Sequence, residues 1–305
     1  MASICRWIFA LAGAACFVEP AVARLSTSLV QIDDTPPRSD DIVVTATKLM
    51  PREIEQAARA VTPPGNLYRE PLAQFQAPVC PGVIGMPDDF AAVMVARIRL
   101  VAQRARIRLD QDKCRANLLV LFVANGQAAL QNMGGKGPWL FDGIGPAQLS
   151  DLAEDPVLKD LAADPGPVHA WVNTRMETRY GEGVPKLLMD DPTMPASRLS
   201  LHLRNDIKAS VVMIDIAAAN GMSPEQIADY AAMRGLARTR PPGQSGTVGT
   251  ILSLFDKAAI APQGMTRFDH AYLRSVYGSV AHVAGITKIA QVAHEVKKAA
   301  KKDDD

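Results

Sequence analysis

Residues 223–236 read SPEQIADYAAMRGL, and this stretch decides which fold we expect. Ser223 is a favourable N-cap, Pro224 suits the first helical position, and Gln226 stands where a capping box places its Glu or Gln. Gly235 can adopt the left-handed conformation that ends a helix. The stretch therefore predicts a helix that begins at Ser223 and ends at Gly235.

Four stretches outside this helix predict β-strands. Residues 116–124 form an unbroken apolar run, which is typical of a strand buried on both faces of a sheet covered by helices. Residues 168–178 alternate between apolar and polar side chains, which indicates a half-exposed strand. Residues 198–204 and 209–216 predict a further pair of strands.

Two further long helices are expected around these strands. Residues 88–105 carry apolar side chains at helical spacing. Residues 266–277 begin with Thr266 as N-cap and Asp269 at the third helical position. Strands and helices together predict one α/β or α+β domain over residues 78–283, with a mixed sheet flanked by helices.

The first 23 residues have the layout of a secretory signal peptide. Arg6 precedes an apolar run over residues 7–18, and small side chains at Ala21 and Ala23 provide a cleavage site. The apolar run is shorter than the ~20 residues that span a bilayer. We therefore expect a periplasmic or secreted protein without a membrane span after cleavage.

Removal of residues 1–23 leaves Cys80 and Cys114 as the only cysteines of the chain. An even pair in an exported protein most often forms a disulfide. The alternative is two buried thiols. We expect a Cys80–Cys114 disulfide.

The charge balance speaks against one class of partner. The chain carries 33 Lys and Arg against 32 Asp and Glu, which gives a net charge of +1. Proteins that bind nucleic acid usually have a clear basic excess or a basic stripe. We therefore expect no nucleic-acid partner.

Residues 24–77 are rich in turn formers and predict a flexible linker with one short helix at Pro51. Within them, DIVVTATK at residues 41–48 resembles the TonB box of TonB-dependent outer-membrane receptors. Such a segment can add as a strand to the sheet of an envelope partner. The alternative is a plain linker. At the other end, residues 284–305 predict a charged helix or tail.

Residues 228–236, ADYAAMRGL, follow the spacing of the zinc-peptidase sequence HExxHxxGL. Downstream, TILSLF at 250–255 falls where metzincin-like peptidases turn through a Ser-Ile-Met segment. The stretch MTRFDHAYLRSVYG at 265–278 is similar to their LTxxDxxgLxxLYG element. The chain thus resembles the metzincin-like zinc peptidases over roughly residues 195–280, and the resemblance implies a degenerate peptidase scaffold.

The same resemblance argues against peptidase chemistry, position by position. Ala228 and Ala232 stand at the two metal-binding histidines, Asp229 at the general-base glutamate, and Arg238 at the third ligand position. Catalytic zinc needs about three protein ligands and an open position for water. The resemblance therefore implies no catalytic residue, no metal site and no cofactor. If zinc were bound nonetheless, His202, Asp215 and His270 would be the first ligands to test.

Two surfaces are candidates for ligand binding. Trp171 shares the polar face of its predicted strand with His169, Asn173 and Arg175, and it either lines a binding surface or is covered by a helix. The arginines of the 88–105 helix form either a patch for acidic glycan or phosphate, or a solvated face.

These observations favour a non-catalytic binding protein on a peptidase-like scaffold, with an envelope protein or peptide as its partner. The alternative is a hydrolase of the cell envelope whose active site the sequence does not reveal. In that case Asp215 would pair with His202 or His270 across the sheet.

Overall fold

The computed structural model describes residues 49–132, 161, 163–184, 201–243, 248–256 and 262–304. They belong to one unit of the chain, Lys48–Asp305. The expected signal peptide and the TonB-box-like segment at 41–48 lie outside the described residues.

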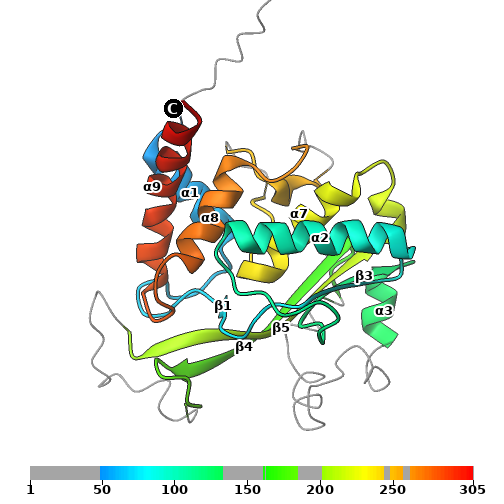
Figure 1. Ribbon diagram of the computed structural model, residues 1–305, viewed down its shortest axis with the longest axis horizontal. Coiled ribbons are helices and arrows are strands. Elements are labelled where there is room, and N and C mark those ends of the chain that lie inside the picture. The colour runs from blue at the N-terminus through cyan, green and yellow to red at the C-terminus, as the bar shows by residue number, and fades with distance from the viewer. Residues whose placement is uncertain are drawn as a thin grey trace, which may run out of the picture. The chain divides into compact units, whose positions relative to one another are not determined.

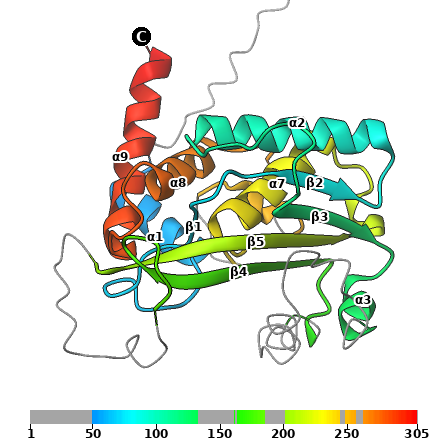
Figure 2. The same ribbon diagram turned by 60° about the horizontal axis from the view of Figure 1, so that its bottom comes forward.

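A mixed five-stranded sheet runs through this unit (Figures 1 and 2). Its central strand is β5, which pairs in parallel with β3 and with the short β1, and antiparallel with β4. On the far side of β3 lies β2, also in parallel. The strands are β1 (Gln74–Phe75), β2 (Pro81–Ile84), β3 (Leu118–Val123), β4 (Val168–Thr178) and β5 (Leu203–Asp215). The expected α/β class with a mixed sheet is confirmed.

The prediction of two separate strands at 198–204 and 209–216 was wrong, because β5 continues without a break from Leu203 to Asp215. The stretch between the predicted strands, residues 205–208, is mostly polar, and tertiary pairing keeps it extended. Ile207 faces Phe75 of β1 and Thr174 of β4. Asp206 lies 2.9 Å from Arg204 and 3.3 Å from Lys208, so its charge is compensated although it is buried.

The predicted long helices are confirmed within one or two residues. They are α2 (Asp88–Arg104), α7 (Pro224–Ala237) and α8 (Arg267–Tyr277). Both predicted capping boxes are present, Ser223 with Gln226 and Thr266 with Asp269. The helices α2 and α7 lie side by side over one face of the sheet (Figures 1 and 2).

The predicted end of α7 at Gly235 was wrong. The helix continues to Ala237, and Arg238 takes the left-handed conformation with φ of 46°. Gly235 serves close packing instead. A Cβ there would lie 3.1 Å from both Leu118 Cδ1 and Ser210 Oγ on the sheet.

The folded unit includes residues that the sequence assigned to the linker and tail. The linker supplies α1 (Pro51–Val61), whose Ile54, Ala58 and Val61 are buried. The tail supplies α9 (Gly285–Asp304), which packs on α1 and α8 and buries Ile289. The expected start at 78 therefore lies too late and the expected end at 283 too early.

The remaining described elements are η2 (Ile216–Ala219), η3 (Ile251–Ser253) and α3 (Gly126–Asn132). Residues of α3 pack on a second, smaller core at the face of the sheet opposite α7. Cys80 and Cys114 form the expected disulfide, which ties the start of β2 to the segment before β3. Within the described ranges, no helix has the length and apolar character needed to cross a bilayer.

Candidate functional site: an arginine-lined pocket

The peptidase-like positions of α7 are packed into the main core. Ala228 and Ala232 have no exposed surface, and both belong to the apolar cluster between the helices and the sheet. Their complete burial makes them packing residues.

Asp229, at the position of the general base, is also fully buried, and its carboxylate is fully occupied. Arg97 of α2 donates two hydrogen bonds to it, Nε to Oδ1 and Nη2 to Oδ2, both 2.7 Å long. The backbone N–H of Met265 donates a third at 2.8 Å. The hydrogen bond with Asp229 raises the pKa of Arg97, against the lowering effect of burial. Asp229 therefore joins α7, α2 and the segment before α8.

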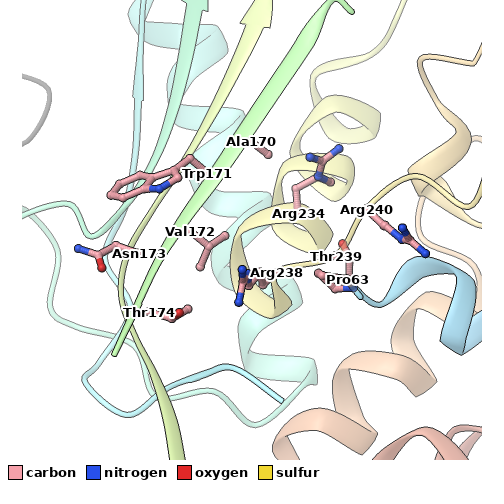
Figure 3. A pocket seen from close by; sticks show the side chains of 10 residues that line it. All are labelled: Pro63, Ala170, Trp171, Val172, Asn173, Thr174, Arg234, Arg238, Thr239 and Arg240. Atoms are coloured by element: carbon pink, nitrogen blue, oxygen red, sulfur yellow. The ribbon is translucent and has the colours of Figure 1, made fainter. Parts of the chain in front are cut away.

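Arg238, at the third ligand position, borders a pocket at the C-terminal end of α7 (Figure 3). The pocket has a volume of about 260 Å³ and lies between that end of the helix and strand β4. Its described lining contains three arginines and no acidic residue. The lining residues are Pro63, Ala170, Trp171, Val172, Asn173, Thr174, Arg234, Arg238, Thr239 and Arg240.

Two of the three arginines are held in place by neighbouring groups. Arg234 donates from Nη1 to the hydroxyl of Tyr230 at 2.9 Å and stacks over that ring. Its Nε is buried without a hydrogen-bond partner. Arg240 donates from Nε to the carbonyl of Ala60 at 3.0 Å, and its backbone N–H bonds to Val61. The partners that position these two arginines are thus a hydroxyl group and a backbone carbonyl, and neither is a carboxylate.

Arg238 differs from its two neighbours. It is partly exposed, its backbone is left-handed, and no described residue forms a hydrogen bond or ion pair with its guanidinium. A non-glycine residue at positive φ is uncommon and is found more often at functional sites. In Figure 3 it lies between Arg234 and the strand residues of β4.

Strand β4 forms the opposite wall through five successive residues, 170–174. The ring of Trp171 points away from the arginines (Figure 3) and is only 7% exposed, packed with Leu121 and Met213 in the second core. Of the two alternatives for Trp171, a residue that lines a binding surface or a covered residue, the structure therefore supports the second. Of the expected polar surface, Asn173 is among the residues that line the pocket, whereas His169 is buried.

The structure does not bring the other expected site residues together. His202 precedes β5 and Asp215 is its last residue, so roughly 40 Å of extended chain separates them. Asp215 accepts a hydrogen bond from the backbone of Gly126 at 2.6 Å and lies near His169. His270 sits on α8 near Arg104. No group of three or more His, Cys, Asp or Glu in the described parts is arranged to hold a metal ion.

The expected arginine patch on α2 is divided among separate partners. Arg97 is bound to Asp229, Arg99 lies 3.4 Å from Asp112, and Arg108 donates to the carbonyl of Gln76. Burial, together with Arg104 and Arg274, lowers the pKa of His270 beside this helix. Arg97 and Arg99 thus connect α2 to neighbouring segments, whereas Arg108 lies beyond the end of the helix.

Comparison with known proteins adds no relative: no family model, no curated protein and no solved structure matches this chain. The resemblance to zinc peptidases and the TonB-box interpretation therefore stay predictions. The arginine pocket was missed in the sequence. Its signal was present in Arg234 and Arg238, one helical turn apart, followed by Arg240.

Proposed function

We propose that this protein is an exported, non-catalytic binding protein on a peptidase-like scaffold, and that it holds the anionic group of its ligand in the arginine pocket. One observation carries the proposal: Arg234, Arg238 and Arg240 line one pocket, and the described lining of that pocket contains no acidic residue.

Charge and size both support an anionic ligand. Hydrogen bonds from guanidinium groups to carboxylate or phosphate are among the strong ones, at about 1.5–3 kcal/mol each. Positive charges that line one pocket repel one another, so a bound anion would relieve that repulsion. A pocket of about 260 Å³ lies just below the usual range for small-molecule sites and suits one charged group with its attached atoms.

The peptidase-like helix supports the proposal as a scaffold. Because Asp229 is committed to Arg97 and to the Met265 backbone, it is not available to activate a water molecule. Ala228 and Ala232 are buried and offer no lone pair to a metal. The chemistry at the end of the helix is therefore recognition by charge.

The test is calorimetric titration of the mature protein with inorganic phosphate and with acetate. We expect binding that weakens with rising salt, and at least a tenfold loss in Arg238→Gln. The matched control is Arg106→Gln, because Arg106 is exposed and also has a positive φ, of 63°, but lies outside the pocket. The proposal would be overturned if neither phosphate nor acetate binds. It would also be overturned if Arg238→Gln and Arg106→Gln lose the same affinity.

A further inference from the structure

The pocket lies along one edge of β4. A few residues further along the strand, the same edge is paired with another segment of the chain. The opposite edge of β4 pairs with β5 along its whole length, from Val168 to Thr178. On the pocket side, Glu177 forms an antiparallel bridge with Gly183, and the backbone N–H of Thr178 donates to the carbonyl of Glu182 at 2.8 Å. The chain that follows β4 therefore occupies the edge beyond the pocket.

This arrangement limits any extended segment that lies against residues 170–174. Only two residues lie between Thr174 and Glu177, so the two are about 10 Å apart along the strand. A segment lying along β4 must consequently end beside the pocket or turn away from the sheet there. A chain that ends at this place puts a terminal group next to the arginines.

The charge of the three arginines determines whether the N-terminus or the C-terminus of such a chain can bind there. A terminal ammonium would be repelled, whereas a terminal carboxylate has the planar, two-oxygen geometry that guanidinium groups bind best. Ala170, Val172 and Pro63 add an apolar wall to the same pocket. This wall suits a small apolar side chain on the last residue.

We propose that the ligand is an extended peptide with a free C-terminus, whose terminal carboxylate lies among Arg234, Arg238 and Arg240. The inference rests on the proposed function and specifies its ligand. Capture of a C-terminal carboxylate is a recurring mode of peptide recognition, in which the extended backbone supplies affinity and the terminal group supplies the anchor.

The test uses three acetylated pentapeptides with the mature protein. The first is KTVTA with a free carboxylate, the second is its C-terminal amide, and the third is KTETA amide. The first and third have the same net charge, and only the position of the carboxylate differs. We expect the free-carboxylate peptide to bind at least tenfold more tightly than either amide, and Arg238→Gln to remove this preference while Arg106→Gln keeps it.

The outcomes separate this inference from the proposed function. If KTETA amide binds as well as the free-carboxylate peptide, or if phosphate binds through Arg238 and none of the peptides does, the C-terminal assignment is wrong and the anion pocket stands. If neither phosphate, acetate nor any peptide binds, both proposals fail. Arg240→Gln provides a second variant if Arg238→Gln does not fold, which thermal melting will show.

Discussion

The guanidinium of Arg97 and the carboxylate of Asp229 are joined by two parallel hydrogen bonds of 2.7 Å. Asp229 has no exposed side-chain surface and Arg97 retains a quarter of its own. The pair connects α2 to α7. Loss of Arg97 would therefore leave the buried carboxylate of Asp229 without its partner.

Arg97→Ala should lower the free energy of unfolding by about 3 kcal/mol, because it leaves the buried carboxylate of Asp229 without its counter-ion. Arg99→Ala is the matched control on the same helix, since its partner Asp112 is 90% exposed. Exposed pairs contribute at most about 1 kcal/mol. Urea unfolding followed by circular dichroism measures both, and equal losses would show that the Arg97–Asp229 pair is not special.

Because of Lys288 in α9, we expect the free energy of unfolding to rise with pH. It has no exposed surface, and its Nζ donates to the carbonyl of Val276 at 2.7 Å. Burial lowers its pKa to about 7 from an ordinary value of 10.5. Between these values the unfolded chain binds more protons than the folded one. The contribution of Lys288 to the free energy of unfolding should therefore increase from pH 7 to pH 9 by up to about 1.4 kcal/mol per pH unit, and this contribution should level off below pH 7.

The substitution Lys288→Met should flatten this slope and stabilise the protein at pH 7. Lys297→Met, at an exposed position of the same helix, should keep the slope. Urea midpoints at pH 6, 7, 8 and 9 provide the measurement. The range stops at pH 9 because burial raises the pKa of Tyr272 and Tyr277, whose titration would add a second pH dependence above that. A slope that survives in Lys288→Met would refute the assignment.

The disulfide between Cys80 and Cys114 should contribute about 2–4 kcal/mol, since it closes a loop of 34 residues in the unfolded chain. The double variant Cys80→Ala and Cys114→Ala should melt at a lower temperature than the oxidised protein. Dithiothreitol should destabilise the wild type and have no effect on the double variant. Mass spectrometry without reduction should find the two cysteines linked, and free thiols on both would contradict this prediction.

Ala232→Leu should destabilise the protein by about 1–3 kcal/mol, because the side chain at this fully buried position has no room for three further carbon atoms. Ala92→Leu provides the control, since Ala92 is exposed on α2. A change within about 0.5 kcal/mol is expected there. Tolerance of leucine at position 232 would reveal space beside α7 that the packing does not show.

Local signals account for what could be predicted about the helices. Ser223 with Gln226 and Thr266 with Asp269 are contacts between residues three apart, so the sequence alone contains both partners. The extent of α7 was harder, because Gly235 looks like a helix end. Its real role is to let the helix approach Leu118, which lies more than a hundred residues away in the sequence.

Long-range contacts explain what could not be predicted. The continuity of β5 depends on strands that precede it by up to about 130 residues, as in the pairing of Phe75 with Ile207. The pocket depends on the carbonyl of Ala60, which holds Arg240 at a separation of 180 residues. No periodicity or short motif contains such information, so the sequence singled out only Arg238, at the position of an absent metal ligand.

The central position of β5 also governs the order in which the sheet can form during synthesis. Three of the other strands pair with β5, and all precede it along the chain. Until about residue 215 has emerged, β2 and β3 are the only described strands that can pair with each other, and the other described strands have no partner. A chain that crosses a membrane with its N-terminus first would thus arrive with most of its sheet unassembled, and would complete it only after β5 had followed.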